Sequence, residues 1–276
     1  MADYASQIGG TDNVPGVDLA PSDGNWAYFF NEGDKVIDLG GGNDQFTGGH
    51  DNYSVFTGGG ADTVTTHGGD DVVAGGGGAD HINTGNGDDL VNPGDGNNLV
   101  FTGAGNDTVV GSDGSGDNTV DGGKGDNNIS GGAGNDVLRA HSGDDTFLAG
   151  NGDDFVNGYA GNDYLVGGAG NDTLIGGRGD DTLTGGTGHD VFFFDSNFGH
   201  DVITDFNGAA GDQIWLKADL NNSHISSPVD VLQFVSGGSS HGVKYTIINI
   251  GGDTIKIQGV DVKDFQAHVS DWIKIQ

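Results

Sequence analysis

Aspartates that recur every nine residues are the side chains of this sequence best suited to chemistry. Counted in nine-residue repeats from Leu39, with one two-residue insertion, the sixth position is Asp in thirteen of seventeen repeats. These residues are Asp44, Asp62, Asp71, Asp80, Asp89, Asp107, Asp136, Asp145, Asp154, Asp163, Asp172, Asp181 and Asp190. The other four repeats carry Tyr53, Asn98, Asn118 and Asn127. Asparagine keeps an oxygen but loses the charge, so we expect the three asparagines to be weaker metal ligands.

Carboxylates repeated along one edge of a structure predict a bound cation. They repel one another unless positive charge lies between them, and nine Lys and Arg residues against 41 acids cannot supply it. The ligands on offer are carboxylates and backbone carbonyls, because the chain has no cysteine and no regular pattern of histidine. Calcium is the expected ion, since it accepts about six to eight oxygen ligands in flexible geometry.

The eighth position of the repeat shows how the chain would place these carboxylates. It is large and apolar every time: Phe46, Val55, Val64, Val73, Ile82, Val91, Val100, Val109, Val120, Ile129, Leu138, Phe147, Val156, Leu165, Leu174, Leu183 and Phe192. One buried residue between two outward ones predicts a three-residue strand, and the glycine-rich remainder predicts a sharp turn. Two repeats then close one coil, and like residues of alternate repeats stack about 4.8 Å apart. The pattern predicts an all-β, parallel solenoid.

The repeat resembles the nonapeptide G-G-x-G-x-D-x-U-x of the RTX proteins, with Gly167–Ile175 as its clearest copy. The resemblance covers residues 39–193 and continues into Gly199–Phe206 and Gly211–Leu216. It implies a right-handed parallel β-roll that binds calcium in its turns. It also implies export of the unfolded chain by type I secretion machinery that reads the C-terminus. Members include toxins, proteases, lipases, epimerases, adhesins and surface-layer proteins, so the resemblance alone does not select an activity.

Three regions are expected along the chain. Residues 39–193 form the calcium-binding roll, and residues 1–38 form an N-terminal β cap with short strands at 26–30 and 35–39. The alternative is that the first twenty residues form an assembly arm that reaches into a neighbouring molecule.

Residues 194–276 are expected to form a mixed α/β cap that carries the secretion signal. Its predicted elements are a capped helix from Ser227 to Val235, a hairpin of 243–250 with 253–258, and a helix from Asp261 to Val269.

Composition narrows the class of protein. There are 57 glycines and four prolines, and the formal net charge is −32. This acidity argues against nucleic acid and anionic membranes as partners. The residues after Met1 have neither a basic region nor an apolar run, so no Sec signal peptide is expected, and no apolar run approaches the length of a membrane span. Weak calcium sites would stay empty at cytosolic calcium concentrations, so a secreted, extracellular or cell-surface location is expected.

Departures from the repeat predict where calcium binding is weak. Repeat two carries Asp51 and Tyr53 where glycine and aspartate are expected, and an insertion lies around Ser112–Gly116. Residues 93–130, which hold the three asparagines, should bind calcium less well. Repeats eleven to seventeen are intact, so folding should begin near the C-terminal end of the roll.

The outward strand positions seven and nine are more apolar than a lone soluble solenoid needs, above all in even-numbered repeats. Those of the even repeats include Val72, Leu90, Val110, Leu148, Tyr164 and Val166. Those of the odd repeats include Leu99, Phe101, Phe155 and Ile175. They reflect either the ordinary β-propensity of exposed residues or a contact surface for another copy or layer.

The sequence offers little that indicates catalysis. It has no H-E-x-x-H, and the G-x-S-x-G string at Gly238–Gly242 precedes a hairpin instead of forming a strand-to-helix elbow. We therefore expect a secreted, non-enzymatic calcium-binding protein that self-assembles with other copies into an extracellular layer, fibre or matrix, or an adhesive structure. The alternatives are a monomeric secreted effector resembling nodulation proteins, and the isolated roll module of an extracellular enzyme such as an alginate epimerase.

Overall fold

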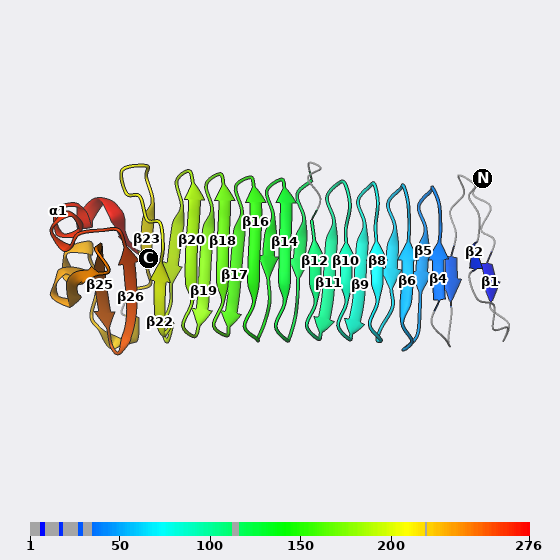
Figure 1. Ribbon diagram of the computed structural model, residues 1–276, viewed down its shortest axis with the longest axis horizontal. Helices are drawn as coiled ribbons and strands as arrows, with labels where there is room; N and C mark the ends of the chain where they lie inside the picture. Colours follow the sequence, from blue (N-terminus) through cyan, green and yellow to red (C-terminus); the bar gives the residue numbers. More distant parts are fainter. Residues whose placement is uncertain (1–5, 9–16, 19–26, 30–34, 112–115, 219) are drawn as a thin grey trace. The chain divides into compact units, whose positions relative to one another are not determined.

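The computed structural model describes residues 6–8, 17–18, 27–29, 35–111, 116–218 and 220–276. The chain divides into an N-terminal body, Met1–Ala140, and a C-terminal body, His141–Gln276. Within the repeats of each body, strands that are consecutive in sequence alternate between two sheets (Figure 1).

Strands of the N-terminal body pair in parallel with the next strand but one in sequence. The first sheet contains, in spatial order, β1 (Ser6–Ile8), β3 (Ala27–Phe29), β5 (Gln45–Thr47), β7 (Thr63–Thr65), β9 (His81–Asn86), β11 (Leu99–Ala104), β13 (Thr119–Asp121) and β15 (Val137–Arg139). The second sheet contains β2 (Val17–Asp18), β4 (Lys35–Asp38), β6 (Tyr53–Phe56), β8 (Val72–Ala74), β10 (Leu90–Asn92), β12 (Thr108–Val110) and β14 (Asn128–Ala133). In most pairs the partners are 18 residues apart, as in Leu90 beside Val72. Two nonapeptides therefore make one coil, as the sequence predicts.

The two strands expected near the start of the chain are present as β3 and β4. They lie in different sheets: β3 pairs in parallel with β1 and β5, and β4 pairs in parallel with β2 and β6. Their described backbone thus continues the pairing pattern of the roll. Most of the first twenty residues, and the insertion at 112–115, lie outside the described residues.

The C-terminal body begins with the same parallel pattern. One sheet contains β17 (Phe155–Ala160), β19 (Thr173–Arg178), β21 (Val191–Phe194), β23 (Gln213–Leu216) and β27 (Ile273–Ile275). The other contains β16 (Thr146–Asn151), β18 (Tyr164–Ala169), β20 (Thr182–Thr187), β22 (His200–Ile203), β26 (Asp253–Gln258), β25 (Val243–Ile250) and β24 (Val235–Ser240). Pairing becomes antiparallel between β26 and β25 and between β25 and β24, so the second sheet ends in a meander.

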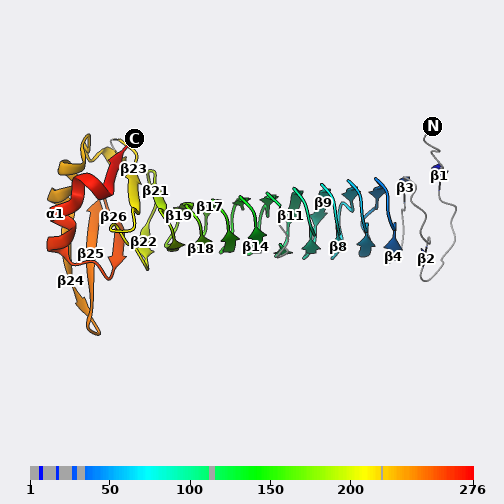
Figure 2. The ribbon, with the colours of Figure 1, turned by 90° about the horizontal axis from the view of Figure 1, so that it is seen from above.

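The mixed α/β cap is part of the C-terminal body. It contains the 3₁₀ helices η1 (Leu220–Asn222) and η2 (Pro228–Phe234) and the helix α1 (Val262–Trp272). Helix α1 packs against β24 and β25 (Figure 2). The predicted hairpin and both predicted helices form, although the first is a 3₁₀ helix and α1 continues three residues beyond Val269. No helix among the described residues is long and apolar enough to cross a membrane.

The interior of the roll is built from the eighth position of the repeat. All seventeen of these side chains are at most 1 % exposed, which confirms the predicted strand pattern. The cap has an aromatic core, in which the Trp272 ring lies 5.5 Å from Phe206 and 6.1 Å from Phe265. Each coil therefore buries about two large apolar side chains, whereas the cap has a denser core of its own.

Candidate metal-binding ladder

The side chain at position six is buried in every repeat. All thirteen aspartates and the three asparagines are 4 % exposed or less. Oδ1 of this residue accepts the backbone N–H of the sixth residue in the preceding coil. In this way Asp62 N–H donates to Asp80 Oδ1 at 2.8 Å, and Asp163 N–H donates to Asp181 Oδ1 at 2.8 Å. One side-chain oxygen of these Asp and Asn residues thus joins neighbouring coils within each body.

The other carboxylate oxygen, Oδ2, accepts no hydrogen bond in ten buried aspartates. These are Asp62, Asp71, Asp80, Asp89, Asp107, Asp163, Asp172, Asp181, Asp190 and Asp201. A buried anionic oxygen without a donor is costly, because it has lost water and gained no partner. Burial accordingly raises the pKa of these carboxyl groups, to about 8 for Asp163, about 7 for Asp172 and about 6 for Asp181.

In repeats that begin with glycine, Oδ2 lies against position one of its own repeat. A Cβ added at Gly158 would collide with Oδ2 of Asp163 and would lie 2.8 Å from the carbonyl oxygen of Gly176 in the next coil. A Cβ at Gly167 would meet the corresponding two oxygens in the same way. The carboxylate oxygen and a backbone carbonyl oxygen therefore flank one small space between coils.

This donor set fits a hard divalent cation. It consists of oxygen atoms, one of them anionic and without a hydrogen-bond donor, which are the ligands that calcium prefers. No three carboxylate or imidazole groups converge anywhere in the described ranges. An ion between coils would therefore be held by few carboxylates together with backbone carbonyl oxygens from the turns.

Asparagine at position six brings its own hydrogen-bond donor to this space. The amide of Asn98 donates to the carbonyl oxygen of Gly96 and to Asn118 Oδ1, each at 3.0 Å. The amide of Asn127 donates to the carbonyl oxygen of Gly125 at 2.9 Å. Amide hydrogens thus bond to carbonyl oxygens of the turn, and weaker calcium binding by these repeats stays a prediction.

Repeat two lacks the carboxylate altogether. The Tyr53 side chain is 1 % exposed, and its ring lies 5.4 Å from that of Phe46. Its hydroxyl accepts the N–H of Gly49 at 2.9 Å, while its own N–H donates to Asp71 Oδ1 at 2.8 Å. The backbone bond between coils is therefore kept, but position six of this repeat has no carboxylate.

A second ladder, at position five, was not anticipated. This position is Asn or Asp in all repeats except those with Ala61, Ala79 and His189. Its Oδ1 accepts the N–H of the fifth residue one coil later, as from Asp88 to Asp70 at 3.0 Å. The bonds at positions five and six therefore run in opposite directions along the roll. The same nine-residue period carries this pattern, so it was visible in the sequence.

The position-six ladder also extends past residue 193. Asp181 N–H donates to Asp201 Oδ1 at 2.9 Å, and Asp190 N–H donates to Asp212 Oδ1 at 3.1 Å. Asp201 is fully buried, and burial raises its pKa to about 9. These two residues of the ladder were missed in the sequence because they follow their partners by 20 and 22 residues instead of 18.

The outward faces of the sheets carry exposed apolar side chains. In the N-terminal body, Phe56, Val72, Leu90 and Val110 on β6–β12 are between 37 % and 44 % exposed. In the C-terminal body, Leu148 and Tyr164 on β16 and β18 are each 44 % exposed, as the even-repeat pattern predicts, and Phe155 on β17 is 38 % exposed.

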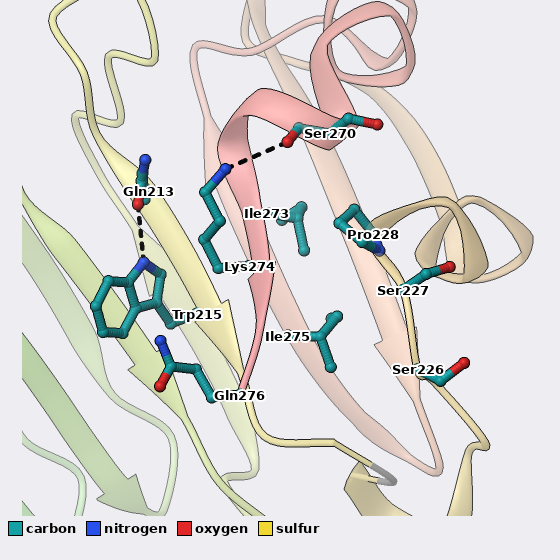
Figure 3. A pocket seen from close by; sticks show the side chains of 10 residues that line it. All are labelled: Gln213, Trp215, Ser226, Ser227, Pro228, Ser270, Ile273, Lys274, Ile275 and Gln276. Carbon is teal, nitrogen blue, oxygen red and sulfur yellow. Dashed lines mark hydrogen bonds between the residues drawn. The ribbon is translucent and has the colours of Figure 1, made fainter.

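A hollow of about 480 Å³ lies beside β23 and β27 in the C-terminal body (Figure 3). Its polar groups are engaged with their neighbours: Trp215 Nε1 donates to Gln213 Oε1 at 2.9 Å, and Lys274 Nζ donates to the carbonyl oxygen of Ser270 at 3.3 Å. The G-x-S-x-G string lies elsewhere in this body, on β24 and the turn that follows it.

Comparison with known families identifies the class of protein. Profiles of the RTX calcium-binding nonapeptide repeat match residues 56–91, 94–115, 113–147, 139–174, 157–192 and 166–203, more than half of the chain. The chain therefore belongs to the RTX calcium-binding nonapeptide-repeat family, and its repeats are calcium-binding repeats. Proteins with such repeats are typically secreted and extracellular.

Among solved structures, one similar chain is the extracellular lipase LipA from Serratia marcescens, with 18 % sequence identity and a TM-score of 0.39. The match covers 89 % of this chain and 40 % of that one, so this chain spans well under half the length of the lipase. No curated protein matches the chain.

Proposed function

We propose that this chain is a secreted, non-enzymatic calcium-binding β-roll that folds when calcium binds and then self-associates into an extracellular layer, fibre or matrix. The observation that carries calcium-coupled folding is the row of buried Oδ2 atoms that accept no hydrogen bond. Without a cation, each of these carboxylates must either stay charged in an apolar setting or take up a proton.

The position-six carboxylates and the turn carbonyls are the proposed ligands. Each coil buries about two large side chains, so hydrophobic burial alone gives little stability to set against the conformational entropy of the glycine-rich turns. A bound ion would neutralise the ladder and join successive coils at once. Metal binding and folding are then one equilibrium, as in other small metal-dependent folds.

Self-association is supported by the exposed apolar side chains of the second sheet. Val72 and Leu90 lie side by side in the register of β8 and β10, and they are 37 % and 43 % exposed. With a formal charge of −32, copies without calcium repel one another. Bound calcium reduces this repulsion, so assembly is expected to follow calcium binding.

The test is molar mass by light scattering together with circular dichroism, first in chelator and then in millimolar calcium. The proposal expects β structure and a large increase in mass to appear together. In the double variant Val72→Lys and Leu90→Lys, folding should persist and the increase in mass should be lost. His81→Lys provides a control, because His81 is exposed on β9 of the opposite sheet.

Two results would contradict parts of the proposal. A chain that folds with calcium and remains monomeric is an effector or an enzyme module, and its apolar faces do not drive assembly. A chain that is already fully folded in chelator does not couple folding to calcium.

A further inference from the structure

Four repeats of the N-terminal body begin with threonine where the repeat pattern has glycine. These are Thr57, Thr66, Thr84 and Thr102, and all four are fully buried. Each hydroxyl donates to the position-one carbonyl oxygen of the next coil. The distances are 3.0 Å from Thr66 Oγ1 to Thr84 O and 3.0 Å from Thr102 Oγ1 to Gly122 O. A hydroxyl therefore bridges the gap between these coils.

The same hydroxyl lies beside the carboxylate of its own repeat. The Thr66 hydroxyl is close enough to the Asp71 carboxylate to interact with it, and the Thr102 hydroxyl is likewise close to the carboxylate of Asp107. A hydroxyl has one proton. Because the proton of the Thr66 hydroxyl goes to the carbonyl oxygen of Thr84, Oδ2 of Asp71 accepts no hydrogen bond.

Glycine repeats of the C-terminal body lack this bridge. At Gly158, the place of a Cβ is taken by Oδ2 of Asp163, and the Gly176 carbonyl oxygen lies on its other side. No hydrogen-bond donor reaches Oδ2 of Asp163. Two electronegative oxygens face one another across this space, so only a cation can join them. A threonine in this place would collide with the carboxylate. A repeat can therefore have either a threonine at position one or a carboxylate in this place, but not both.

We propose that the position-one threonines replace a calcium ion at their coils, so that hydroxyl hydrogen bonds join these coils where the glycine repeats require the metal. This inference rests on the proposed role of the position-six ladder in calcium binding. It divides the sites of the chain into two classes. Coils that contain threonine bind fewer ions and keep their pairing in chelator, whereas coils of glycine repeats depend on calcium.

The test is the full chain with all four threonines replaced by glycine. Bound calcium per chain is measured by equilibrium dialysis and elemental analysis, and hydrogen exchange of residues 57–110 is measured in chelator. The variant should bind more calcium than the parent, approaching one added ion for each threonine replaced, and its exchange in chelator should become faster. An unchanged calcium count overturns the inference, and so does a lower count, because the hydroxyl would then be a ligand itself.

Further variants separate the hydroxyl from side-chain volume and chain flexibility. Replacement of the four threonines by serine keeps the hydroxyl, and replacement by valine keeps the volume, so both should retain the parental calcium count. Only the valine variant should lose protection in chelator. Equal behaviour of the two would overturn the inference even if the glycine variant does not fold. Thr63→Gly, at an outward strand position of β7, should add no calcium.

Calcium binding by the parental chain distinguishes a failure of the proposed function from a failure of this inference alone. If the parent binds no calcium, the proposed function and this inference both fail. If the parent binds calcium and the glycine variant binds no more, only this inference fails.

Discussion

Replacing Asp181 by asparagine should change stability in opposite directions with and without calcium. Asp181 is 1 % exposed, and burial raises its pKa from 3.8 to about 6. At pH 7 the folded state therefore disfavours the charged carboxylate by about 3 kcal/mol relative to the unfolded chain. Asparagine removes this penalty and keeps the Oδ1 that accepts Asp163 N–H at 2.8 Å. In chelator we expect Asp181→Asn to be more stable, by up to about 3 kcal/mol.

In calcium the same change should be destabilising. A site that is occupied at about 1,000 times its dissociation constant adds about 4.1 kcal/mol to the folding of the parent, which exceeds the penalty of about 3 kcal/mol that asparagine removes. Asparagine removes the anionic ligand and puts an amide donor in its place, as Asn98 does. When calcium is present at this ratio, the free energy of unfolding of the variant should therefore be about 1 kcal/mol lower than that of the parent.

Urea unfolding followed by circular dichroism measures both effects, with a stabilising osmolyte added to the chelator sample so that the fold is populated. Asp180→Asn is the matched control. Asp180 is next in the chain and exposed, and asparagine can keep the oxygen that accepts His200 N–H at 2.9 Å. The control should show little change in either condition. Loss of stability in both conditions for Asp181→Asn, or the same reversal for Asp180→Asn, would refute the reasoning.

Two further predictions concern pH and the turns. In chelator the folded fraction should rise as the pH is lowered from about 8 to about 5. The reason is that carboxyl groups such as Asp172 and Asp163 have folded pKa values of about 7 and about 8. The cost of burying their charge disappears as they take up protons. In calcium the trend should reverse, since protons compete with the ion; circular dichroism across this range tests both signs. Gly179→Ala should destabilise the roll by more than the roughly 1–3 kcal/mol of its backbone conformation, because φ is +131° and a Cβ would collide with the carbonyl oxygen of Gly161. Gly242→Ala isolates the conformational part, since φ there is +82° and nothing lies within 4 Å; equal urea midpoints for the two variants would contradict the predicted collision.

The roll was predictable because both of its main signals are periodic. The apolar eighth position requires a strand with one buried side chain, and the aspartate at position six must repeat in every coil. The sequence could not show that the two oxygens of each carboxylate have different roles. In Asp181, Oδ1 binds the backbone of the preceding coil and Oδ2 has no donor. This difference between Oδ1 and Oδ2 depends on the stagger between coils, which is a property of the packed turns and not of any single repeat.

Sequence reasoning missed some residues of the ladders for two different reasons. Asp201 and Asp212 belong to the ladder, but the chain between them and their partners is two and four residues longer than one coil. A fixed period of nine cannot find ligands once loop lengths change. The position-five ladder was periodic and was overlooked because its side chains are largely exposed, as Asp180 is. Exposed turn residues such as Asp180 nevertheless join neighbouring coils, because their side-chain oxygens accept backbone N–H groups.

The position of Asp201 and Asp212 bears on how the roll folds. A parallel solenoid grows by adding a coil to an existing edge, so the first coil needs a preformed surface. The C-terminal body supplies one, because Trp272, Phe206 and Phe265 form an aromatic core in its cap. Asp201 and Asp212 lie between this cap and the last regular repeats and accept the backbone of the coil before them. Calcium bound there would add coils to a core that is already formed, and growth would proceed from the cap toward the N-terminus, as the intact repeats at this end of the roll predict.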